Sequence, residues 1–123
     1  MNNDAFNERR KYYRITKHFI LRYFDISVPE KKYSASQLKN ISEGGMCLIT
    51  ETSFATGTML GVEIKTPFFA EVTFLKGEVL ASHERAKNII YETRLEFRDL
   101  SPEAIEVIKH TVEFFKNKEN NHD

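Results

Sequence analysis

Arginine residues near the start of the chain form the first group of side chains that could bind a ligand. The segment ERRKYYR covers residues 8–14 and places Arg10 and Arg14 in an RxxxR spacing, with Arg9 beside Arg10. A guanidinium group is planar and always charged, so it can bind phosphate through paired hydrogen bonds and stack on flat rings. These properties suit a ligand with phosphate groups and purine rings, although RxxxR alone is also common as a solvated basic patch.

A short polar segment later in the chain offers a second set of ligand-binding groups. The sequence NISEGG, residues 40–45, matches the pattern (D/N)xSxxG. The Asn40 amide can donate and accept hydrogen bonds, and Ser42 offers a hydroxyl group. Gly45 has no Cβ, so a ligand or another backbone segment can approach it closely. Taken alone, the segment favours a plain turn, because Asn, Ser and Gly are ordinary turn residues.

No group of residues has the spacing of a catalytic or metal site. The sequence contains no nucleophile elbow, no phosphate-binding P-loop and no HExxH pattern. Its histidines and carboxylates are scattered, and its single cysteine, Cys47, lies in an apolar stretch that predicts a buried, inert thiol. We therefore expect no enzymatic activity, no metal and no cofactor.

Length and composition predict one globular domain. The chain has 123 residues, of which 41% are hydrophobic and 29% charged. It has no apolar run of the roughly 20 residues that a membrane-spanning helix needs, and its N-terminus lacks the apolar stretch of a signal peptide. We expect a cytoplasmic protein without a membrane span.

The charge is unevenly distributed although the formal net charge is +0. Residues 1–22 contain six Lys or Arg against two Asp or Glu, whereas residues 23–123 contain twelve against sixteen. A basic segment on a mildly acidic body favours a compact anionic partner over a long nucleic acid, which would usually require a basic domain.

The elements that must position these residues are mostly strands. Stretches rich in aromatic and β-branched residues, separated by Gly, Pro and charged residues, predict strands at 18–26, 33–40, 46–50, 59–65, 69–75, 77–82 and 89–97. Many short strands followed by one helix indicate a small antiparallel barrel or sandwich.

The last element is predicted to be a helix. Ser101 is a suitable N-cap, Pro102 suits the first helical position, and Glu103 suits the positive end of the helix dipole. The predicted apolar stripe consists of Ile105, Ile108, Val112 and Phe115, flanked by Ala104, Val107, Thr111 and Phe114. We expect a flexible N-terminus at 1–7 and a disordered tail at 116–123.

The two polar motifs, in this order, resemble those of the PilZ domain family, the bacterial receptors for the second messenger cyclic di-GMP. The resemblance covers residues 8–115. Weaker similarities lie in ISEGGMCL (41–48), TGTML (56–60), KGEVL (76–80) and LEFRDL (95–100).

The resemblance implies a mainly β fold, a six-stranded antiparallel β-barrel with a C-terminal α-helix, over which the RxxxR arm folds onto the ligand. Arg94 stands where the family often has glycine, and either crowding or an added cationic contact remains open. The ligand-binding residues that the resemblance implies are Arg9, Arg10, Arg14, Asn40, Ser42, Gly44, Gly45 and Arg94.

The function implied is signal transduction: a cyclic di-GMP receptor, as a monomer or weak dimer, that relays the messenger level to a protein partner by ordering its arm. The alternative is a PilZ-like interaction scaffold, for pilus or motility assembly, that does not bind nucleotide. A third interpretation, a barrel that binds single-stranded nucleic acid, is disfavoured by the acidic body, and we expect no DNA binding.

Overall fold

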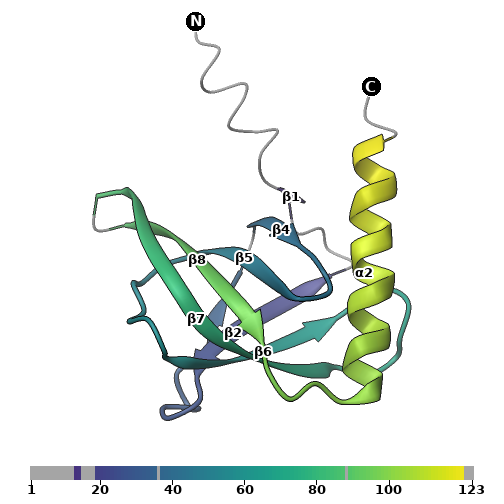
Figure 1. The fold of residues 1–123 in the computed structure, drawn as a ribbon, viewed down its shortest axis with the longest axis horizontal. Helices are drawn as coiled ribbons and strands as arrows, with labels where there is room; N and C mark the ends of the chain where they lie inside the picture. The colour runs from purple at the N-terminus through teal and green to yellow at the C-terminus, as the bar shows by residue number, and fades with distance from the viewer. Residues whose placement is uncertain (1–12, 15–18, 36, 88, 121–123) are drawn as a thin grey trace, which may run out of the picture.

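The computed structural model describes residues 13–14, 19–35, 37–87 and 89–120. Within them it contains eight strands and one helix (Figure 1). The elements are β1 (Tyr13–Arg14), β2 (Ile20–Asp25), β3 (Tyr33–Ser34), β4 (Gln37–Ile41), β5 (Gly45–Thr50), β6 (Met59–Lys65), β7 (Thr73–Ala86), β8 (Ile90–Phe97) and α2 (Pro102–Asn120).

The strands form one antiparallel sheet that curls strongly, with α2 standing beside it (Figure 1). The strand order is β1-β4-β5-β8-β7-β6-β2-β3. Only residues 35 and 36 separate β3 from β4, yet β3 pairs with β2 and β4 pairs with β5. Ala35 N–H donates to the Leu21 carbonyl at 2.8 Å before the chain leaves β2. The segment from β3 to β4 therefore connects the two sides of the curled sheet.

The mainly β fold with a C-terminal helix is confirmed, but the count of six barrel strands is wrong. The segment predicted as one strand at 33–40 is two strands, because it changes its pairing partner from β2 to β5. The segments predicted at 69–75 and 77–82 are instead joined in β7, which starts only at Thr73 and continues through Gly77. Gly77 pairs with Phe97 on β8, so this glycine does not interrupt the ladder.

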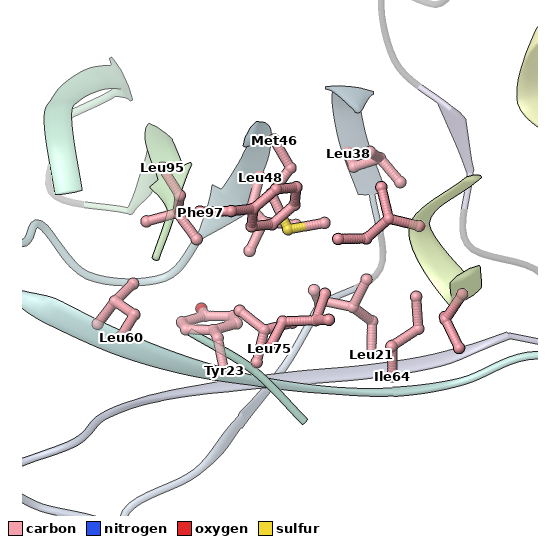
Figure 2. Packing of buried hydrophobic residues seen from close by; sticks show 14 of the residues in the cluster. Leu21, Tyr23, Leu38, Met46, Leu48, Leu60, Ile64, Leu75, Leu95 and Phe97 are labelled. Atoms are coloured by element: carbon pink, nitrogen blue, oxygen red, sulfur yellow. The ribbon is translucent and has the colours of Figure 1, made fainter. Parts of the chain in front are cut away.

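The hydrophobic core lies between the two halves of the curled sheet (Figure 2). Apolar side chains from β4, β5 and β8 face those from β2, β6 and β7. Successive side chains of a strand point to opposite faces of the sheet, so each strand contributes alternate residues to this core. The first group includes Leu38, Met46, Leu48, Leu95 and Phe97, and the second includes Leu21, Tyr23, Leu60, Ile64 and Leu75.

Helix α2 begins where the sequence predicts and continues further than expected. The Ala104 N–H donates to the Ser101 hydroxyl oxygen at 3.1 Å, which confirms Ser101 as the N-cap. The helix reaches Asn120 and so extends into the predicted tail at 116–123. The central position assigned to Ile105 is wrong, because its side chain is exposed. The buried face consists of Ala104, Val107, Ile108, Thr111 and Phe115.

Ring contacts join the second half of α2 to the chain just before β2. The Phe19 ring lies 5.1 Å from that of Phe114 and 5.5 Å from that of Phe115.

Within the described residues, no helix is both long and apolar enough to cross a membrane.

Candidate ligand-binding site

One row of paired residues crosses β4, β5 and β8 on the outer face of the sheet. Asn40 pairs with Cys47, and Cys47 pairs with Arg94. The neighbours of Cys47 along β5, Met46 and Leu48, point into the core, so Cys47 and its partners face outward. The curled sheet therefore brings Asn40 and Arg94, which are distant in sequence, onto the same face.

Two β-bulges add cations to this face. The register of β4 shifts between Leu38 and Asn40, and that of β7 shifts between Glu84 and Ala86, which leaves Lys39 and Arg85 outside the regular pairing. A bulge redirects side chains and is common beside functional sites. Both bulge residues contact the carboxylate of one β8 residue, Glu92.

Glu92 holds the two bulge cations in a small ion-pair network. Lys39 Nζ lies 3.4 Å from Glu92 Oε1, and Arg85 Nη1 lies 3.2 Å from Glu92 Oε2. The Glu92 side chain is mostly buried, so these contacts are shielded more than ordinary surface ion pairs. With Arg94, three cations and one carboxylate lie close to the row of Asn40, and the next outward carboxylate along β8, Glu96, lies 3.0 Å from Arg98 Nη2. This local balance favours an anionic ligand.

Asn40 and Arg94 have exposed side chains that remain available for binding. Neither side chain forms a hydrogen bond or ion pair with another residue in the described part of the chain. An amide and a guanidinium that lie on one face and lack internal partners can both engage a polar ligand.

Ser42 shapes the turn between β4 and β5. Its N–H donates to the Gly45 carbonyl at 2.8 Å, and its hydroxyl oxygen accepts a hydrogen bond from the Gly44 N–H at 3.2 Å. The Gly44 carbonyl in turn accepts from the Phe97 N–H at 2.9 Å, which attaches the turn to the end of β8. The hydroxyl of Ser42 is thus used within the turn itself.

The two glycines of the turn differ in their surroundings. A Cβ on Gly45 would collide with the backbone carbonyl oxygen of Leu95 on β8, whereas a Cβ on Gly44 would have nothing within 4 Å. The close approach of β5 to β8 therefore accounts for glycine at Gly45 without a ligand.

The second arginine of the RxxxR motif lies at the edge of the same sheet. In β1, Arg14 pairs with Gln37 and Tyr13 pairs with Leu38, so β1 runs antiparallel beside β4. Because the two strands are antiparallel, the residues of β1 pair with β4 residues that come nearer to Asn40 as β1 is followed from Arg14 to Tyr13. Arg9 and Arg10 lie outside the described residues.

The Cys47 thiol lies among the charged groups of this face. It is 5% exposed, which confirms the predicted burial. Burial raises the pKa of the Cys47 thiol, and the negative charge of Glu92 raises it further, while Lys39 and Arg94 act in the opposite direction. No cluster of three or more potential metal ligands is present among the residues that the structure describes.

Sequence reasoning did not identify Lys39, Arg85 and Glu92. The spacing of buried residues in β4 contained a usable signal for Lys39. The core-facing residues Leu38 and Ile41 are three positions apart rather than two, as expected where a bulge places two residues on the outer face.

Comparison with protein families gives one match that covers most of the chain. The family model described as PilZ domain matches residues 8–114. No curated protein is similar enough in sequence to count as a match.

Several solved structures share the fold. The PilZ domain with c-di-GMP of YcgR from Escherichia coli has a TM-score of 0.58 and 18% identity, covering 94% of this chain and 99% of that chain. The Bacillus subtilis inhibitor of motility MotI/DgrA has a TM-score of 0.60 and 18% identity, covering 94% of this chain and 54% of that one.

MrkH from K. pneumonia has a TM-score of 0.59 and 16% identity, covering 89% of this chain and 51% of that one. This chain thus spans about half the length of the MotI/DgrA and MrkH chains. At these identities the structural similarities establish the fold alone.

Proposed function

The chain belongs to the PilZ domain family, and we propose that it is a non-enzymatic receptor module for cyclic di-GMP. The observation that carries the proposal is the position of β1 beside β4. This pairing puts Arg14 of the RxxxR motif on the strand next to the one that carries Asn40 of the second motif. The ligand named with the YcgR PilZ domain is c-di-GMP, which supports the same ligand class here.

The chemistry of the outer face fits a dinucleotide with two phosphates and two guanines. Arginine paired with guanine O6 and N7 is the commonest specific contact to a base, and each charge-assisted hydrogen bond contributes about 1.5–3 kcal/mol. Arg14 and Arg94 together would then supply a large share of the roughly 8 kcal/mol of a micromolar complex. Asn40 would donate to and accept from a guanine edge.

The remaining motif residues have supporting roles in this proposal. Arg9 and Arg10 add cationic contacts from the arm. Ser42 and Gly45 fix the turn that presents Asn40, since their hydrogen bonds and close packing already serve the turn. Gly44 leaves open space beside the ligand.

We further propose that binding is relayed by ordering of the arm. Because Tyr13 and Arg14 are already paired with β4, the segment before them can close over the outer face from a fixed point. Hydrogen exchange tests this directly: the amides of residues 8–12 should gain protection when cyclic di-GMP is added. Unchanged exchange at saturating ligand would contradict the relay but not the binding.

Isothermal titration calorimetry tests the ligand itself. The chain should bind cyclic di-GMP with micromolar or tighter affinity, and cyclic di-AMP, GTP and a short single-stranded DNA much more weakly. Absence of binding to all of them would favour the scaffold interpretation. Binding of the single strand with a steep salt dependence would favour a nucleic-acid-binding barrel.

A further inference from the structure

A cavity of about 680 Å³ lies at the start of α2, apart from the residues of the proposed nucleotide site. Residues 69–74, which lead into β7, form one wall, and the first turns of α2, with Glu103, Glu106 and Val107, form another. We refer to this cavity as the α2 pocket. Its volume is in the range of sites that bind ligands or anchor side chains of a partner.

The wall formed by residues 69–74 exposes large apolar side chains. Val72 is 55% exposed and Phe74 is 50% exposed, although both border the cavity. The Phe74 ring also lies 6.3 Å from the ring of the buried Phe24 on β2, the strand beyond β6. Single exposed apolar residues are ordinary, but adjacent ones at a cavity are typical of docking surfaces.

The rim of the α2 pocket is acidic. Four carboxylates, those of Glu71, Asp99, Glu103 and Glu106, border it together with one cation, Lys76. Lys76 Nζ lies 3.3 Å from Asp99 Oδ2, so its charge is already balanced. The helix dipole explains an acidic residue only in the first turn of α2, at Glu103. The remaining charge is complementary to a basic partner.

We propose that the α2 pocket is a docking site for a basic peptide segment of a partner protein. Large apolar side chains of that segment would pack against Val72 and Phe74, while Lys or Arg side chains beside them would face Glu103 and Glu106. The proposal does not require nucleotide binding, because none of the residues of the outer face of β4, β5 and β8 takes part.

Selection from a displayed library of short random peptides on the full chain tests the proposal. The enriched peptides should combine net positive charge with at least two large apolar residues. Synthetic versions should lose affinity by about tenfold or more on Phe74→Ser and on the double change Glu103→Lys with Glu106→Lys, as measured by fluorescence polarisation.

Matched controls separate a local effect from general damage. Leu80→Ser removes an exposed apolar residue of the same strand outside the pocket, and Glu30→Lys reverses an exposed charge in a turn. Both variants should bind the peptides normally, and all four should melt close to the parent temperature. Cyclic di-GMP affinity should be the same in Phe74→Ser and the parent, so failure of one site is distinguishable from failure of the other.

Three results would overturn the proposal. The first is that no peptide is enriched over the Phe74→Ser variant. The second is enrichment of acidic or purely polar peptides. The third is self-association of the parent chain in sedimentation experiments that Phe74→Ser abolishes, because the surface would then bind a second copy.

Discussion

Asn40 and Arg94 lie on either side of Cys47 in a single row of paired residues across three strands. Adjacent strands are about 4.8 Å apart, so the backbones of Asn40 and Arg94 are separated by roughly 10 Å. A ligand that contacts both side chains must pass over Cys47. The buried thiol is therefore a natural reporter of occupancy at this face.

Alkylation of Cys47 should be slow in the free protein and slower still with ligand. Because burial raises the pKa of the thiol, the reactive thiolate is scarce at neutral pH, and the rate should rise as the pH increases. Saturating cyclic di-GMP should reduce the rate of Cys47 alkylation by iodoacetamide several-fold. Intact-mass spectrometry measures this rate. Urea-unfolded protein provides the fast reference, and an unchanged rate with bound ligand would place the ligand elsewhere.

Arg14→Ala should weaken cyclic di-GMP binding by at least about tenfold, equivalent to about 1.4 kcal/mol, because it removes the guanidinium that the proposed function assigns to the ligand from a residue paired with β4. The melting temperature should change little. Arg22→Ala is a matched control, since Arg22 is an exposed strand arginine whose Nε lies 3.6 Å from Glu63 Oε1, away from the row of Asn40. Equal affinity losses in both variants would indicate a general charge effect instead of a specific contact.

Arg94→Ala should also weaken binding, because the exposed Arg94 side chain has no ion-pair partner among the described residues. Calorimetry should show a loss of several-fold to about tenfold. If Arg94 instead crowds the ligand, the same variant will bind more tightly. Arg94→Lys distinguishes charge from geometry: a guanidinium that pairs with guanine is not replaced by an ammonium group.

The strand pattern was predictable from sequence wherever apolar residues alternate and a turn follows. Residues 59–65 match β6 for this reason, and Ser101 marked the start of α2 correctly. The pairing change between β3 and β4 could not be predicted, because it depends on where the curled sheet places β2 and β5. Local residue preferences contain no information about how the curled sheet places β2 relative to β5.

The candidate site was only partly predictable for the same reason. Asn40 and Arg94 were identified individually, but their shared row depends on the register of β4 on β5 and of β5 on β8. The Glu92 network depends on bulges in two different strands. At Gly45 the sequence left two close approaches open, that of a ligand and that of another backbone segment, and the Leu95 carbonyl shows that a backbone segment does approach it.

Gly45→Ala should destabilise the fold, whereas Gly44→Ala should not. At Gly45 the added methyl group would collide with the Leu95 carbonyl, and overpacking of this kind costs about 1–3 kcal/mol. At Gly44 the space is open, and the change should lie within about 0.5 kcal/mol of the parent. Urea unfolding of the two variants measures the difference. Equal stabilities would mean that β5 and β8 can separate at this point without cost.

Tyr23 should make the fold sensitive to alkaline pH. Its side chain is 0% exposed, and its hydroxyl oxygen accepts a hydrogen bond from the Glu51 N–H at 2.9 Å. Burial, with a smaller contribution from the charge of Glu51, raises the pKa of Tyr23 from 10.0 to about 12.

A folded-state pKa above the unfolded value means that the stabilisation is complete below pH 10 and is lost as the pH rises toward 12. The loss should approach roughly 3 kcal/mol. Tyr23→Phe cannot ionise, so its unfolding free energy should fall less steeply over this interval, although loss of the Glu51 hydrogen bond should cost it about 1 kcal/mol at neutral pH. Urea titrations at several pH values compare the two proteins. If the unfolding free energies of the two proteins fall in parallel up to pH 12, folding does not raise the pKa of Tyr23 and the prediction is wrong.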